Sequence, residues 1–145
     1  MIRQFDRLPD AVRLEEGRPY FESLSKKRFQ LFLKRLFDIA VALIVLVVLS
    51  PIFLVAAVSV AVSSKGPVFY LQQRVGLYGK PFKIIKFRTM VTDADKKGAQ
   101  ITVGGRDPRI TSVGYVLRKT SVDELPQMIN ILKGDMSLVG TRPEV

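Results

Sequence analysis

An apolar run divided by a serine-proline pair constrains this chain more than any other feature. Residues 39–62 carry no charge over 24 positions, and as one helix they would extend roughly 36 Å. That length exceeds the hydrocarbon core of a bilayer, which is about 30 Å thick. One spanning helix is therefore the simplest interpretation. A secretory signal peptide is not predicted, because the run begins far from the N-terminus and no small-residue cleavage site is evident.

The pair Ser50-Pro51 at the midpoint favours a different path. Proline removes an internal hydrogen bond and kinks a helix, so each half would measure only roughly 18 Å. The positive-inside rule places basic flanks on the cytoplasmic side, which indicates a re-entrant helix that bends at Pro51 and leaves by the face it entered. A kinked spanning helix stays open on this pattern alone. Basic side chains flank the run on both sides: Lys26, Lys27, Arg28, Lys34 and Arg35 before it, and Lys65, Arg74, Lys80 and Lys83 after it.

Composition narrows the chemistry that the rest of the chain can perform. There is no cysteine and no histidine, and 23 basic residues face 13 acidic ones, for a net charge of +10. Disulfides, thiol nucleophiles, imidazole bases and cysteine or histidine metal sites are excluded. Catalysis must use carboxylates, hydroxyls, lysines or a hard metal held by oxygen. The basic excess suits phosphate, whether in nucleic acid, lipid headgroups or a small molecule.

The pattern divides the chain into three parts. Residues 1–33 read as an N-terminal extension that ends in a cationic, amphipathic interfacial helix. Residues 34–64 form the broken membrane helix, and Asp38 near its start is predicted to pair with Lys34 or Arg35. Residues 65–145 remain to form a small globular domain.

Within that domain, β-branched and aromatic residues around a "GLYGK" turn predict a strand-loop-strand hairpin. A polar loop over 92–109 follows. A short helix is predicted to start at Thr111 or Ser112 and to close with Arg118 and Lys119. The next helix is predicted to start at Asp123 and to end at Lys133-Gly134.

Two adjacent carboxylates, Asp123 and Glu124, are the candidate reactive groups. Pro126 is tolerated only in the first turn of a helix, which predicts Asp123 at the N-cap or first helical position. A structural interpretation is open, because Ser121 and Glu124 also match a capping box. A catalytic one is open as well. A helix N-terminus keeps a carboxylate ionised and receives phosphate, an ionised aspartate can attack phosphorus, and a glutamate can hold Mg²⁺.

Basic residues of the same domain are candidates to clamp phosphate oxygens. Any one taken alone could instead belong to a solvated, lipid-facing basic surface. The two helices around Thr120 superficially resemble a helix-turn-helix, but "PQMINIL" offers almost no side chains to base edges, so no nucleic-acid partner is predicted. The candidate phosphate-binding residues are Lys86, Arg88, Arg106, Arg109, Arg118, Lys119 and Arg142.

Several motifs in one order carry a specific resemblance: "KRLFD", the Ser-Pro-broken run, "GPVFYLQQRVGLYGKPFKIIKFRTM", "DPRIT", "LRKTSVDELPQMINILKGDMSLVG" and "RPE". Together, over residues 34–144, the chain resembles the bacterial sugar transferase family, the monotopic phosphoglycosyl transferases. The resemblance implies a mainly α fold with a small β-hairpin. It also implies a re-entrant helix, kinked at Ser50 and Pro51, that holds a cytoplasmic catalytic domain on the bacterial inner membrane with both termini cytoplasmic.

The resemblance also implies the reaction. A UDP-sugar loses UMP to Asp123, and undecaprenyl phosphate then collects the sugar 1-phosphate from the aspartyl intermediate, in a Mg²⁺-dependent cycle with Glu124 as the metal-associated partner. This transfer is the first membrane step of glycan assembly.

Two departures from the family pattern qualify these expectations. The usual Pro-Arg-Pro reads Thr141-Arg142-Pro143 here, and family members normally continue for several dozen residues beyond this point. The sequence therefore leaves open a non-catalytic, truncated remnant or a membrane-tethered scaffold or binding module. The sugar, the nucleotide and the glycan pathway are not predicted, and a homodimer is left open.

Overall fold

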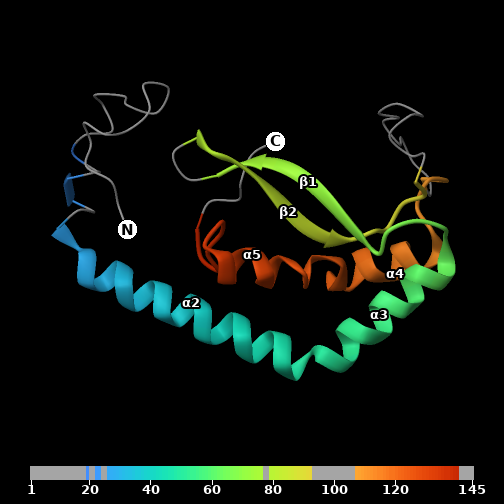
Figure 1. The fold of residues 1–145 in the computed structure, drawn as a ribbon, viewed down its shortest axis with the longest axis horizontal. Helices are drawn as coiled ribbons and strands as arrows, with labels where there is room; N and C mark the ends of the chain where they lie inside the picture. The colour runs from blue at the N-terminus through green and yellow to red at the C-terminus, as the bar shows by residue number, and fades with distance from the viewer. Residues whose placement is uncertain (1–18, 20–21, 24–25, 77–78, 93–106, 141–145) are drawn as a thin grey trace.

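The computed structural model describes residue 19 and residues 22–23, 26–76, 79–92 and 107–140. Helices dominate these residues, and two strands form a small antiparallel sheet. Figure 1 shows α2 and α3 as a wide V, with the hairpin, α4 and α5 along its inner side. In chain order the elements are α2 (Arg28–Val48), α3 (Ser50–Ser63), β1 (Phe69–Val75), β2 (Pro81–Phe87), α4 (Ser112–Lys119), the 3₁₀ helix η6 (Val122–Glu124) and α5 (Gln127–Lys133).

The apolar run is bent at the serine-proline pair. Among the described residues no single helix has the length and hydropathy of a membrane span, whereas α2 and α3 meet both criteria together across a 65° bend. Pro51 has no N–H to donate to the carbonyl of Val47, and the Ser50 hydroxyl donates to that oxygen instead, at 2.7 Å. The predicted break is confirmed. Helix α2 also crosses the predicted boundary between residues 33 and 34 without interruption.

The V exposes an unusually large apolar surface. Few of its side chains are buried, among them Ala42 of α2 and Ala56 and Val60 of α3. Contiguous exposed apolar surface of this extent marks contact with a membrane or with another protein. The large exposed apolar side chains on the V are Phe29, Phe32, Leu33, Leu36, Phe37, Leu43, Ile44, Val47, Val48, Ile52, Leu54, Val55, Val58 and Val62.

Strands β1 and β2 form the predicted hairpin, paired from Phe69 with Phe87 to Val75 with Pro81. The outer edge of β2 meets the side chain of Asn130 from α5. Its amide oxygen accepts from the N–H of Ile85 at 3.0 Å, and its nitrogen donates to the carbonyl of Lys83 at 2.8 Å. Asn130 thus makes the two hydrogen bonds that a third strand would make.

The core lies where α3, β2 and α4 meet. Phe87 is 1% exposed and packs with Ala56, Val60 and Leu117. The ring centroid of Phe87 lies 4.9 Å from that of Phe53, within the range of favourable aromatic pairs. This cluster joins the second arm of the V to the hairpin and to α4.

Polar contacts fasten the first arm of the V to α5 and to the segment after it. Arg35 donates to the carbonyls of Ile131 at 2.5 Å and Leu132 at 2.9 Å, where the C-terminal end of a helix favours a cation. The predicted pair of Lys34 and Asp38 is confirmed at 3.2 Å. The hydroxyl of Ser137 contacts Lys34 and donates to Asp38.

Candidate active site

The acid pair lies on η6, in the connection between α4 and α5. Ser121 adopts a left-handed conformation with φ of 57°, which turns the chain out of α4. Pro126 then forms the N-cap of α5, and the helix begins at Gln127. The prediction that this helix starts at Asp123 is wrong, because the proline precedes the helix instead of lying within its first turn. The capping box is also wrong, because the side chain of Ser121 makes no capping hydrogen bond.

Strand β2 supplies a cation to the acid pair. The Nζ atom of Lys86 lies 2.9 Å from Oε1 of Glu124, with 18% of the lysine side chain and 38% of the glutamate side chain exposed. Neighbouring residues of a strand point to opposite faces, so Lys86 reaches η6 while Phe87 enters the core. The same short strand therefore positions both the site and the core beneath it.

The carboxyl group of Asp123 is partly buried beside its charged neighbours. Burial raises its pKa above the ordinary value, and the negative charge of Glu124 raises it further, while Lys86 and Arg118 act in the opposite direction. The sequence predicted a helix N-terminus that favours the ionised form, and the direction of the shift is the reverse. An aspartate with a raised pKa is more basic once ionised, and perturbed carboxyl groups of this kind gather at functional sites.

The charge of Arg118 acts on Asp123 and on a further acid, Asp107. On the last turn of α4, Arg118 donates from Nε to the hydroxyl of Thr89 at 2.8 Å, and its charge lowers the pKa of both Asp107 and Asp123. Asp107 is held by Arg109 at 2.7 Å, and this hydrogen bond is the main reason that its pKa falls to about 2. Arg118 is therefore within electrostatic reach of both carboxylates.

The other candidate phosphate-binding residues lie elsewhere or have partners of their own. Arg88 is only 6% exposed, and its guanidinium donates to the carbonyl and hydroxyl oxygens of Ser64 at 2.6 and 2.9 Å, at the end of α3. Arg109 binds Asp107, and Lys119 is exposed on the last turn of α4. Arg106 and Arg142 lie outside the described residues. Of the candidates that the structure describes, Lys86 contacts the acid pair and Arg118 acts electrostatically on Asp123.

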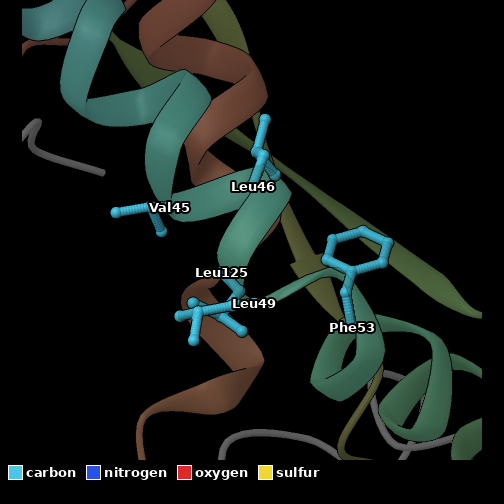
Figure 2. Close-up of a pocket in the computed structure, with 5 residues that line it drawn as sticks. All are labelled: Val45, Leu46, Leu49, Phe53 and Leu125. Carbon is cyan, nitrogen blue, oxygen red and sulfur yellow. The ribbon is translucent and has the colours of Figure 1, made fainter.

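An apolar recess connects the helix bend with the residue that follows the acid pair. Val45 and Leu46 of α2, Leu49 at the break and Phe53 of α3 line it together with Leu125, as Figure 2 shows. Every lining side chain is apolar. Because Leu125 directly follows Glu124, the acid pair lies beside the apolar V and not at the opposite end of the domain.

The donor set suits a magnesium ion held jointly with substrate. The part of the chain that the structure describes contains no cluster of three or more carboxylate, histidine or cysteine side chains. Mg²⁺ usually binds proteins through one or two carboxylates and takes its remaining ligands from substrate phosphates and water. Glu124 is an oxygen donor of the kind that this mode of binding uses.

Two structurally important side chains were not identified from the sequence. Thr89, in "FRTM", holds Arg118, and Asn130, in "INIL", holds the edge of β2. A polar residue within an apolar helical stretch could have singled out Asn130. Nothing in the local pattern distinguishes Thr89, because its partner is 29 residues away.

Sequence comparison with known proteins places this chain in a family. The sequence model of the bacterial sugar transferases matches residues 29–145. The chain belongs to this family. A Bacillus subtilis member with a provisional name as an undecaprenyl-phosphate N-acetylgalactosaminyl 1-phosphate transferase is 46% identical over 123 residues, which cover 84% of this chain and 68% of that protein.

Two longer members are also similar to the chain. The UDP-N-acetylgalactosamine-undecaprenyl-phosphate N-acetylgalactosaminephosphotransferase of Aeromonas hydrophila is 50% identical over 78% of this chain and 26% of its own length. The UDP-glucose:undecaprenyl-phosphate glucose-1-phosphate transferase of Escherichia coli K12 is 51% identical over 77% of this chain and 24% of its own length. The chain thus spans about a quarter of these two relatives.

Proposed function

We propose that this protein transfers a sugar 1-phosphate from a UDP-sugar to undecaprenyl phosphate through a covalent intermediate on Asp123. The observation that carries the proposal is the arrangement of η6, in which a partly buried aspartate adjoins a glutamate paired with Lys86 at 2.9 Å. Family membership adds the class of reaction, and the relatives' names add the lipid acceptor.

The chemistry balances as two displacements at one phosphorus atom. An Oδ atom of Asp123 attacks the sugar-bearing phosphorus of the donor, the bond from that phosphorus to the bridging oxygen breaks, and UMP leaves with the bridging oxygen. An oxygen of undecaprenyl phosphate then attacks the same phosphorus and releases the Asp123 carboxylate. Dividing one transfer into two steps lets each substrate bind in turn.

The residues around Asp123 have separate roles in the proposed reaction. Arg118 and Lys86 supply positive charge for the phosphate oxygens. Glu124, together with substrate phosphates, would hold Mg²⁺, which when bound neutralises the diphosphate and stabilises the departing UMP. In the absence of substrate, Lys86 compensates the charge of Glu124.

We further infer that α2 and α3 enter the cytoplasmic leaflet of the inner membrane and leave it by the same face. The 65° bend, the exposed apolar side chains of the V and the basic residues at both of its ends support this path. Such a path holds the acid pair at headgroup level, where the phosphate of the acceptor lies. Cysteines introduced on either side of the V should both be labelled from the cytoplasmic side only.

The direct test is UMP release from a panel of UDP-sugars with Mg²⁺ and undecaprenyl phosphate. We expect release with at least one sugar, and its loss in Asp123→Asn. A matched control is Asp135→Asn, which alters an aspartate beyond the other end of α5. If wild-type protein released no UMP with any sugar, a remnant or scaffold function would replace the proposed one.

A further inference from the structure

A buried hydroxyl holds Arg118, the arginine whose charge acts on the Asp123 carboxyl group. Arg118 is exposed on the last turn of α4, yet its Nε atom donates to Oγ1 of Thr89 at 2.8 Å. Thr89 itself is only 7% exposed. A flexible, exposed side chain is thus attached at one point to a buried one.

The backbone of Thr89 is fixed by the first turn of the same helix. Its carbonyl accepts from the N–H of Thr111 at 3.0 Å, and a β-carbon on Gly114 would lie 2.1 Å from that carbonyl oxygen. Gly114 and Arg118 are four positions apart and share one face of α4. Residues from both ends of α4 therefore contact Thr89. Gly114 lets the helix approach the Thr89 carbonyl closely, because it has no β-carbon.

The hydrogen bond leaves one edge of the guanidinium available. Nε is engaged, while Nη1 and Nη2 have no hydrogen-bond partner among the described residues. Two parallel N–H groups on one edge match two oxygens of a phosphate group. A guanidinium attached through Nε loses less rotamer freedom when it binds a phosphate than one that moves freely.

We propose that Thr89 is a positioning residue, whose hydroxyl orients Arg118 so that the Nη1–Nη2 edge receives the diphosphate of the nucleotide sugar. This inference rests on the proposed function, and adds to it a residue that makes no contact with the substrate. Thr89 acts through Arg118 alone, so its effect disappears when Arg118 is absent.

The test is a double-mutant cycle on the burst of UMP release in the absence of the lipid acceptor. Thr89→Val removes the acceptor oxygen and keeps the side-chain shape. We expect it to slow the burst by about tenfold, as the loss of one hydrogen bond to a charged group does. Thr89→Ser retains the hydroxyl and should stay within about twofold of wild type. In an Arg118→Ala background, Thr89→Val should have no further effect.

The matched control is Thr120→Val, because the Thr120 hydroxyl donates to the backbone carbonyls of Val116 and Leu117. Its burst should equal that of wild type. Two outcomes overturn the inference while the proposed function stands: a normal burst in Thr89→Val, or an equal slowing by Thr89→Val with and without Arg118. A wild-type protein that releases no UMP overturns the proposed function, and the inference with it.

Discussion

The ammonium group of Lys86 lies 2.9 Å from a carboxylate oxygen of Glu124, joining strand β2 to the 3₁₀ helix that carries Asp123. This contact places one positive charge beside two adjacent negative ones. Burial and Glu124 raise the pKa of Asp123, and Lys86 limits the rise. The pKa of Asp123 thus depends on Lys86, which lies 38 positions before Glu124 in the sequence.

Lys86→Met tests this dependence through pH. Removing the positive charge should raise the pKa of Asp123 further, because the ionised carboxylate loses a favourable neighbour. In the proposed reaction the ionised form attacks phosphorus, so the acid side of the pH profile of UMP release should move to higher pH. Lys83→Met, on the same strand but exposed, should leave the profile in place. An equal shift in both variants would argue against the assignment.

Asp123→Asn should stabilise the protein at neutral pH. The folded-state pKa of Asp123 lies above the ordinary value of 3.8, so its contribution to stability is complete below that value and is lost as pH rises through the folded-state pKa. At pH 7 the ionised carboxylate therefore opposes folding, and asparagine removes that penalty. Thermal unfolding should show a higher Tm for the variant than for wild type at pH 7. This difference in Tm should disappear toward about pH 3. A Tm difference that grew in acid would contradict the raised pKa of Asp123.

Ser50→Ala should weaken the bend. The Ser50 hydroxyl donates at 2.7 Å to the Val47 carbonyl, which also accepts a backbone N–H at the end of α2. The loss of one neutral hydrogen bond costs about 0.5–1.5 kcal/mol, measurable as a loss of unfolding free energy in detergent. Ser59→Ala, in the middle of α3, is the matched control and should change little. Equal losses in the two variants would remove the special role of Ser50.

Phe87→Ala should be among the most damaging substitutions in the core. The ring is 1% exposed and contacts Phe53 and Phe69, and truncation of a buried phenylalanine costs about 3–5 kcal/mol. Denaturant unfolding measures the loss. Val116→Ala, at a position 58% exposed, should stay within about 0.5 kcal/mol of wild type. A loss below that of Val116→Ala would contradict the placement of the core.

Local elements could be predicted from the sequence where a residue type has a single structural effect. Alternating β-branched and aromatic residues around a glycine turn predicted the hairpin, and the structure confirms it. Thr111 caps α4 through its hydroxyl, and Gly134 ends α5 in a left-handed conformation, as predicted. The break at Pro51 followed from the missing amide proton. Each of these signals lies within a few residues of the feature it predicts.

The connection that carries Asp123 was harder to predict, because a proline can occupy either of two positions near the start of a helix. Pro126 could occupy the first turn or precede the helix, and a left-handed Ser121 with a 3₁₀ turn made the second arrangement possible. Tertiary contacts were beyond the reach of sequence reasoning. The contact of the buried Arg88 with Ser64 and the pairing of Lys86 with Glu124 both depend on the folded position of β2 and its neighbours.

The central claim is that Asp123 becomes covalently bonded to phosphorus. Mass spectrometry of protein incubated with a UDP-sugar and Mg²⁺, without undecaprenyl phosphate, tests it most directly. The account predicts a sugar phosphate adduct on the peptide that contains Asp123, its loss when the lipid acceptor is added, and none in Asp123→Asn. UMP release only when both substrates are present, with no adduct at any stage, would contradict the account.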